Sequence, residues 1–168
     1  MWLAAAELRP VGRDAYATEL EAAKASSTLQ LLFKAARLLN ERAVERLRRL
    51  TKVPVRAAHT TLLPHIDLEG TRLTELARRL GVSKQAVGQL VDELVEMGVL
   101  ERAADPADAR AKLVRFTRRG RAGLFEGLAV LKELERELEQ RLGAATMRTV
   151  HDALGVMVAS YGEAAPRR

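Results

Sequence analysis

Apolar residues recur at spacings of three and four along most of the chain, which is typical of amphipathic helices. One such pattern covers residues 13–50, with an interruption expected near the "SST" of residues 26–28. Another predicts a long helix over residues 118–141, which Gly143 ends, and a last helix over about residues 145–161. The pattern therefore predicts a mainly α-helical protein.

A shorter helix is expected after Pro54, because proline in the first helical turn loses no hydrogen bond. Pro64 is expected to bend this helix or to end it early. Two further short helices are predicted over about residues 74–80 and 83–97. In the helix after Pro54, the residues expected to face the core are Val55, Ala58, Leu62 and Ile66.

The segment "LTELARRLGVSKQAVGQLVDEL" (residues 73–94) has the residue types that a helix-turn-helix needs. Ala77 is small enough for the point where two helices cross, and Gly81 tolerates the positive φ of a tight turn. Val87 returns the second helix to the core. The other residues expected to face the core are Leu76, Leu80, Val82 and Leu90. An ordinary helical hairpin would explain any one of these features, but their combined spacing favours DNA binding.

The side chains left outside at the start of the second helix suit contact with DNA. Ser83 is the expected N-cap. Glutamine bonds adenine in two places, lysine reaches guanine or phosphate, and glycine permits close approach. A helix that enters the major groove uses its first turns for such contacts. The predicted DNA-binding residues of this helix are Ser83, Lys84, Gln85, Gly88 and Gln89.

A two-stranded ribbon is predicted directly after the helix pair, which is the order of a winged helix-turn-helix. Residues 99–103 and 111–117 are the expected strands, with "DPADAR" between them. Side chains alternate along a strand, so Val114 and Phe116 are expected to pack while the opposite face, with Arg115, carries charge.

Arg110, expected at the tip of the ribbon, is the candidate for the minor groove, whose concentrated negative potential suits arginine. Asp105 and Asp108 would repel phosphate, so we expect them to shape the turn and hold Arg110 by hydrogen bonding. Without the helix pair before it, the ribbon would be interpreted as a charged surface hairpin.

Charge and composition narrow the function classes. The net charge is +6, and residues 99–121 hold seven basic and three acidic side chains. The absence of cysteine excludes disulfides, zinc-thiolate sites and thiol redox sensing. No apolar run approaches the ~18–20 residues that span a bilayer, and "MWLAAAELRP" is no convincing secretory signal, so a cytoplasmic protein without membrane contact is expected.

An enzyme is not expected. The chain has no Gly-rich phosphate loop, no HExxH, no G-x-S-x-G and no CxxC. We therefore predict no catalytic residues, no metal site and no cofactor.

Residues 71–120 resemble the winged helix-turn-helix core of the MarR family of bacterial transcription regulators, and the helix layout extends the likeness to about residues 28–160. The resemblance is carried by "TELA", "GVSKQAV", "GVLER", the Asp-x-Arg of Asp108 and Arg110, and "FT-x-x-G". It implies a homodimer whose first and last helices interlock, a wing arginine in the minor groove, and control of DNA binding by small, often phenolic, ligands. Many members carry "DRR" in the wing. Ala109 stands in the middle here, which weakens the wing contact or shifts it to Arg110 and Lys112.

Three regions are expected: an N-terminal helical dimerisation region (1–53), a winged helix-turn-helix domain (54–120) and C-terminal dimerisation helices (121–168). The terminal leucine stripes have little to bury against in a small winged domain, so a symmetric partner is favoured over packing within one chain. The expected DNA is a double-stranded, pseudo-palindromic operator with half-sites about one turn, ~10 bp, apart. The first 25 or so residues exceed what the family core requires.

A small-molecule effector is expected at the junction of the dimer helices and the winged domain, where it would change the separation of the two reading helices. Arg56, His59, His65 and Met97 belong to this junction, but a histidine in such a helix is more often a surface or satisfied residue, so no ligand-binding residue is predicted. The alternative function is a winged helix for protein contact without DNA affinity. The glutamines and Lys84 at the reading positions argue against that alternative.

Overall fold

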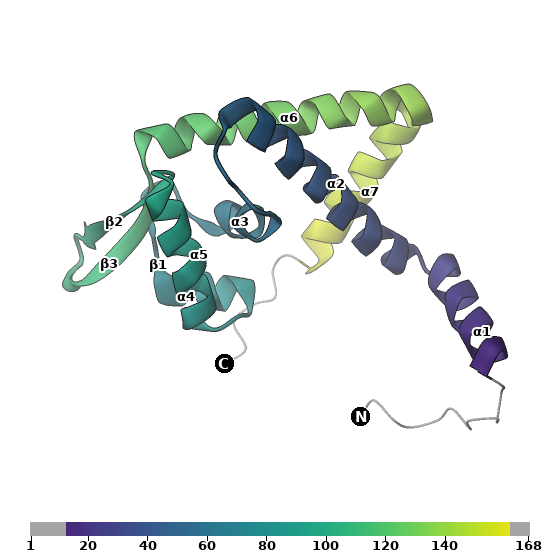
Figure 1. Ribbon diagram of the computed structural model, residues 1–168, viewed down its shortest axis with the longest axis horizontal. Helices are drawn as coiled ribbons and strands as arrows, with labels where there is room; N and C mark the ends of the chain where they lie inside the picture. The colour runs from purple at the N-terminus through teal and green to yellow at the C-terminus, as the bar shows by residue number, and fades with distance from the viewer. Residues whose placement is uncertain (1–12, 162–168) are drawn as a thin grey trace. The chain divides into compact units, whose positions relative to one another are not determined.

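The computed structural model describes residues 13–161, and it confirms a mainly helical chain with a small antiparallel sheet (Figure 1). The helices are α1 (Arg13–Ser26), α2 (Thr28–Thr51), α3 (Ala57–Leu62), α4 (Leu73–Leu80), α5 (Lys84–Glu96), α6 (Arg118–Leu142) and α7 (Ala144–Tyr161), with a 3-10 turn, η1 (Leu63–His65), after α3. The strands are β1 (Thr71–Arg72), β2 (Leu100–Asp105) and β3 (Asp108–Phe116). The chain divides into two compact units, one ending at Glu41 and the other beginning at Arg42.

The first unit holds α1 and the first half of α2. The predicted interruption is confirmed at Ser27, whose hydroxyl accepts the N–H of Gln30 at 3.3 Å and so caps the start of α2. No residue from 14 to 41 is buried. The large apolar side chains exposed in this half of α2 are Leu29, Leu31, Phe33, Leu38 and Leu39.

The second unit has its main core between the short helices and the sheet. The sheet order is β1-β3-β2, and α4 and α5 pack beside it (Figure 1). Val114 and Phe116 are buried and Arg115 is exposed, which confirms the alternation along the second wing strand. The buried residues of this core are Leu62, Ile66, Leu76, Ala77, Val87, Val91, Leu94, Leu100, Val114 and Phe116.

The helix after Pro54 begins later than predicted. Residues 52–56 are not helical, so Pro54 lies before α3 rather than in its first turn. The later start changes which face is inside: Ala58 is exposed and His59 is buried in its place. The early end at Pro64 is confirmed, because η1 follows α3 at once. The other predicted core residues of this segment are buried: Val55, Leu62 and Ile66.

The turn of the helix-turn-helix is built on Gly81, which has a φ of +66° and closes α4 in the left-handed conformation. Val82 was expected in the core, but it is 47% exposed. Its N–H bonds the Ala77 carbonyl at 3.2 Å, so the backbone is held at the turn while the side chain stays in solvent.

The wing strands are longer than predicted. The turn consists of Pro106 and Ala107 alone, so the segment "DPADAR" is mostly strand. Arg110 is consequently the third residue of β3 rather than part of the turn. The third strand, β1, was not predicted; it adds two residues against β3.

Helix α6 begins where the sequence predicts. Thr117 is its N-cap and accepts the N–H of Gly120 at 2.9 Å. A Cβ at Gly120 would lie 1.9 Å from the Val99 carbonyl oxygen, so this turn of α6 can approach the β2 end only with glycine.

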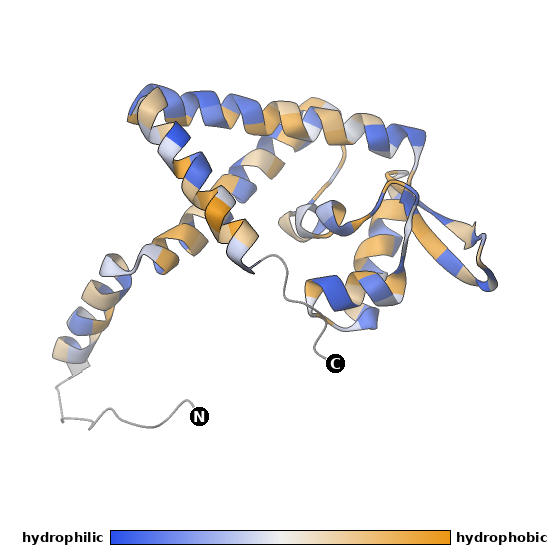
Figure 2. Ribbon diagram, turned by 180° about the vertical axis from the view of Figure 1, so that it is seen from behind, coloured by the Kyte–Doolittle hydropathy of each residue, from blue (hydrophilic) through white to orange (hydrophobic). Residues whose placement is uncertain are grey.

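A second, smaller cluster joins α2 and α6 through Ala43, Val130 and Leu134. Arg46 reinforces it by donating to both carboxylate oxygens of Glu137, at 2.6 and 2.8 Å. Helix α7 contains no buried residue, although hydrophobic residues recur along it (Figure 2). Its exposed large apolar side chains are Val150, Leu154, Val156, Met157, Val158 and Tyr161.

Candidate nucleic-acid interface

The first turns of α5 present polar side chains to solvent. Ser83 is the N-cap, and its hydroxyl accepts the N–H of Ala86 at 3.2 Å. Lys84, Gln85 and Gln89 are exposed and Gly88 is half-buried. Val87 is fully buried between them, so the helix shows its polar edge because its apolar edge is fixed in the core.

The second half of α5 is anchored to α3. The carboxylate of Glu93 accepts the His59 Nε2 hydrogen at 2.8 Å and pairs with the guanidinium of Arg56. The Arg56 pairing, followed by the His59 hydrogen bond, holds the pKa of Glu93 below its usual value. Because the Nδ1 atom of His59 accepts the N–H of Arg56 at 3.1 Å, the Nε2 atom carries the hydrogen and donates it. This network fixes the helix from its far end and leaves the first turns free.

The wing carries Arg110 and Lys112 as exposed residues of β3. By strand alternation they continue the face of Val114 and Phe116, beyond the point where that face is buried. Arg115, on the opposite face, is not free: its Nε donates to Glu101 at 2.7 Å. The separation into a packed face and a charged face thus holds over residues 113–117, and nearer the turn the unpaired cations Arg110 and Lys112 extend the packed face.

Asp105 and Asp108 shape the wing turn. Asp105 accepts the N–H of Ala107 at 2.8 Å, and Asp108 accepts the N–H of Arg110 at 3.1 Å. Their charged partner is Arg72 and not the side chain of Arg110. The Ala107 N–H and then Arg72 lower the pKa of Asp105, so this carboxylate stays ionised.

Pairing separates the basic side chains between residues 56 and 117 into two groups. Those paired with carboxylates are Arg56, Arg72, Arg78, Arg79, Arg102 and Arg115. Those without an acidic partner, in this fully described stretch of backbone, are Lys84, Arg110 and Lys112. The unpaired cations thus lie at the start of α5 and on the wing, which are the two places where DNA contacts are predicted from the sequence.

Known proteins resemble this chain in sequence and in fold. Residues 55–111, which run from the approach to α3 into the wing, match the family model described as "MarR family". The HTH-type transcriptional regulator TcaR of Staphylococcus aureus (strain Newman) is 25% identical over 100 residues, which cover 58% of this chain and 66% of that regulator. The crystal structure of apo MarR from E. coli matches with a TM-score of 0.65 and 24% identity, covering 79% of this chain and 97% of that one. The winged region of the chain is therefore similar to MarR-family regulators.

A second solved structure of the same fold is CouR from Rhodococcus jostii RHA1 bound to p-coumaroyl-CoA, with a TM-score of 0.59 and 23% identity, covering 80% of this chain and 93% of that one. At this identity the match shows the common fold alone. Within residues 13–161, no helix combines the length and the apolar composition that a membrane span needs.

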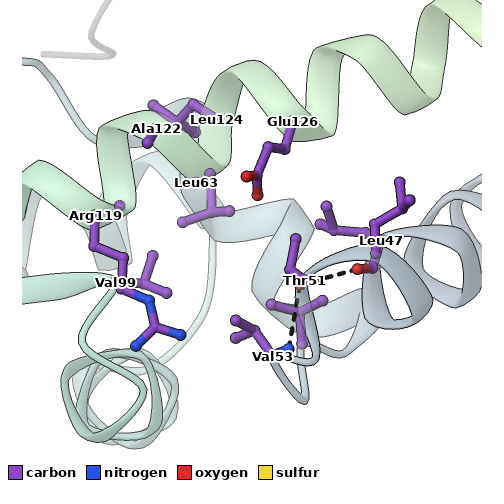
Figure 3. A pocket seen from close by; sticks show the side chains of 13 residues that line it. Leu47, Thr51, Val53, Leu63, Val99, Arg119, Ala122, Leu124 and Glu126 are labelled. Carbon is purple, nitrogen blue, oxygen red and sulfur yellow. Dashed lines mark hydrogen bonds between the residues drawn. The ribbon is translucent and has the colours of Figure 1, made fainter.

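A pocket of about 340 Å³ lies in the second unit of the chain, between the end of α2 and the start of α6 (Figure 3). Its walls are mainly apolar, and Arg119 and Glu126 extend toward it from α6 (Figure 3). The lining residues are Leu47, Leu50, Thr51, Val53, Val55, Leu63, Val99, Arg119, Gly120, Ala122, Gly123, Leu124 and Glu126.

None of the four side chains named for the junction lines this pocket: Arg56, His59, His65 and Met97 all lie elsewhere. Arg56 and His59 are engaged with Glu93. The lining residues come from segments far apart in the chain, and no local motif announces them.

Proposed function

We propose that the protein is a dimeric, sequence-specific DNA-binding transcription regulator. The observation that carries the proposal is the position of Lys84, Arg110 and Lys112, the lysine and arginine side chains between residues 56 and 117 that have no acidic partner. Charges that fold stabilisation does not use are available to phosphate, and neutralising phosphate supplies most of the affinity of DNA-binding proteins.

In the proposed complex, the start of α5 enters the major groove. Gln85 and Gln89 meet base edges, with adenine as the preferred partner of glutamine. Ser83 and Lys84 contact phosphate, and the half-buried Gly88 allows the backbone to approach. On the wing, Arg110 enters the minor groove and Lys112 contacts the neighbouring backbone.

The proposed homodimer is supported by α7, whose large apolar side chains include Val156, Val158 and Tyr161 at 67%, 69% and 85% exposure. Several large apolar side chains exposed on a helix that has no buried residue favour an interface with a second chain. Residues 1–53 and 121–168 would form it, although residues 1–12 and 162–168 lie outside the described part of the chain, and residues 54–120 would bind DNA. A two-fold dimer requires a pseudo-palindromic operator with half-sites about one turn, ~10 bp, apart.

The pocket beside α6 is the proposed effector site. Its size suits a small organic molecule, its apolar walls suit a hydrophobic body, and Arg119 has no acidic partner within the described residues. CouR, a protein of the same fold, was solved with p-coumaroyl-CoA, which supports a ligand-responsive regulator. The protein would act in the cytoplasm and carry out no catalysis.

The test is a fluorescence-anisotropy titration with duplex DNA over a range of salt concentrations. The wild type should bind with steep salt dependence, and Lys84→Ala and Arg110→Ala should each reduce the slope of log K against log salt by about 0.9. Lys132→Ala, an equal loss of charge at an exposed position of α6, is the matched control and should leave the slope unchanged. Absence of binding to any duplex at low salt would instead support the protein-contact alternative, which the comparisons do not favour.

A further inference from the structure

Arg72 lies where the sheet meets the helix-turn-helix. It is the last residue of β1, it pairs with Leu113 of β3, and it is the N-cap residue of α4. Its backbone therefore belongs to both the wing sheet and the reading unit. Nothing in the sequence pattern marked it, because its partners are more than thirty positions away.

The guanidinium of Arg72 reaches the far end of the wing. Its Nε and Nη2 atoms lie 2.7 and 2.6 Å from one carboxylate oxygen of Asp105, and Nη2 lies 3.7 Å from Asp108. Asp105 is only 7% exposed, so the pair is shielded from water on the carboxylate side. Arg72 neutralises the buried charge of Asp105. Among the described residues, no buried side-chain nitrogen or oxygen lacks a hydrogen-bond partner.

The carboxylates of Asp105 and Asp108 in turn hold the backbone of the wing turn. The second oxygen of Asp105 accepts the N–H of Ala107, and the second oxygen of Asp108 accepts the N–H of Arg110. Hydrogen bonds thus run from the start of α4 through Asp105 to the backbone of Ala107, and the 3.7 Å ion pair with Asp108 extends the contact to the backbone of Arg110. A two-stranded hairpin is marginally stable by itself, so the direction of the wing depends on such contacts.

We propose that Arg72 is a positioning residue for DNA binding: it fixes the wing tip relative to α4 and α5, so that Arg110 meets the minor groove while α5 occupies the major groove. The inference rests on the proposed function. Arg72 is 45% exposed, but both donors that the structure engages point to the wing, so it acts through Arg110 rather than by touching DNA. Removing it leaves Asp105 with a buried charge and no cation, and the turn loses its anchor.

The test is a double-mutant cycle measured by DNA-binding titration of the full chain. Arg72→Gln and Arg110→Ala should each weaken binding by about tenfold, the size of a lost charged contact. The double variant should bind no more weakly than Arg110→Ala alone, because the wing contact can be lost only once. Arg72→Lys, which keeps the charge but lacks the second donor, should recover part of the affinity.

Lys84→Ala distinguishes positioning from general destabilisation. Combined with Arg72→Gln, it should multiply the two losses, since Lys84 lies on α5 and is independent of the wing. Multiplying losses for the Arg72 and Arg110 pair, or unchanged affinity in Arg72→Gln, would overturn the proposal. An unchanged affinity in Arg110→Ala would overturn the wing contact itself, and with it the proposed function of the wing.

Discussion

From α3 to the end of β3 the large apolar side chains point mostly inward, and every arginine except Arg110 is paired with a carboxylate; in α7 no residue is buried and the apolar side chains lie in solvent. Leu94 of α5 is fully buried, whereas Leu154 of α7 is 39% exposed. The winged region therefore has the contacts it needs to fold on its own chain. Helix α7 lacks them, and this difference supports a second subunit as its missing partner.

The largest expected effect is in the winged core. Leu94→Ala should lower the free energy of unfolding by about 2–5 kcal/mol, because a fully buried leucine leaves a cavity among packed neighbours. Chemical denaturation at two protein concentrations measures it. The same loss at both concentrations would support a core that is complete within one chain, and a loss below 1 kcal/mol would contradict it.

The next effect concerns α7. Val158→Asp, at a position 69% exposed in the single chain, should weaken the dimer by about 2–4 kcal/mol, since it places a charge in the proposed interface. Sedimentation should show a monomer. The helix content of the variant should be unchanged, as expected for a folded chain. Leu68→Asp, at a position of the winged region that is also 69% exposed, is the matched control and should remain dimeric. If Val158→Asp sediments like the wild type, α7 is not the interface, and a second subunit no longer explains why its apolar side chains are exposed.

A smaller effect is expected from the polar edge of α5. Gln85→Ala and Gln89→Ala should leave unfolding unchanged, because both side chains are exposed, and should cost about 1–3 kcal/mol in binding to the preferred sequence. Selection from a random DNA pool measures the preference. A uniform weakening on all sequences would make them phosphate contacts instead.

The sequence predicted the helix-turn-helix well because its determinants are local. Ala77, Gly81 and Val87 lie within eleven residues of one another, and the structure buries Ala77 and Val87 and places Gly81 in the left-handed conformation. Ser83 and Thr117 were found as N-caps for the same reason, since a cap is defined by its own turn. The failures of the prediction have a different origin.

Residues whose environment depends on distant segments were missed. Val82 has the apolar side chain of a core residue, but it lies in the turn between the two helices and is exposed. Ala58 was expected in the core but is exposed, and His59 is buried instead. The reason is that α3 starts three residues after Pro54, a boundary that periodicity alone does not set. Arg72 and the pocket lining depend on contacts between segments far apart in the chain, so no spacing rule could have identified them.

The smallest expected effect concerns surface pairs of the winged region. Arg78 and then Arg79 lower the pKa of Glu75 to about 2. Because the folded-state pKa lies below the usual value of 4.5, the contribution of Glu75 to stability is present above pH 4.5 and is lost as the pH falls toward 2. Solvent screens these exposed groups, so the effect should be slight.

Glu75→Gln isolates this effect. Thermal unfolding between pH 2 and pH 7 should show a slightly shallower acid dependence for the variant than for the wild type. A parallel pair of curves would mean that the Glu75 pairs contribute nothing to folding.

The placement of α5 and the wing on DNA can be measured directly, because the chain contains no cysteine. Single variants Gln85→Cys, Ala111→Cys and Lys132→Cys would each carry a tethered iron-EDTA group that cleaves nearby DNA. The account predicts focused cleavage from position 85 at two symmetric places about one helical turn apart, cleavage from position 111 in the flanking minor grooves, and none that is focused from position 132. Equal cleavage from positions 85 and 132, or no focused cleavage from position 85 on bound DNA, would contradict it.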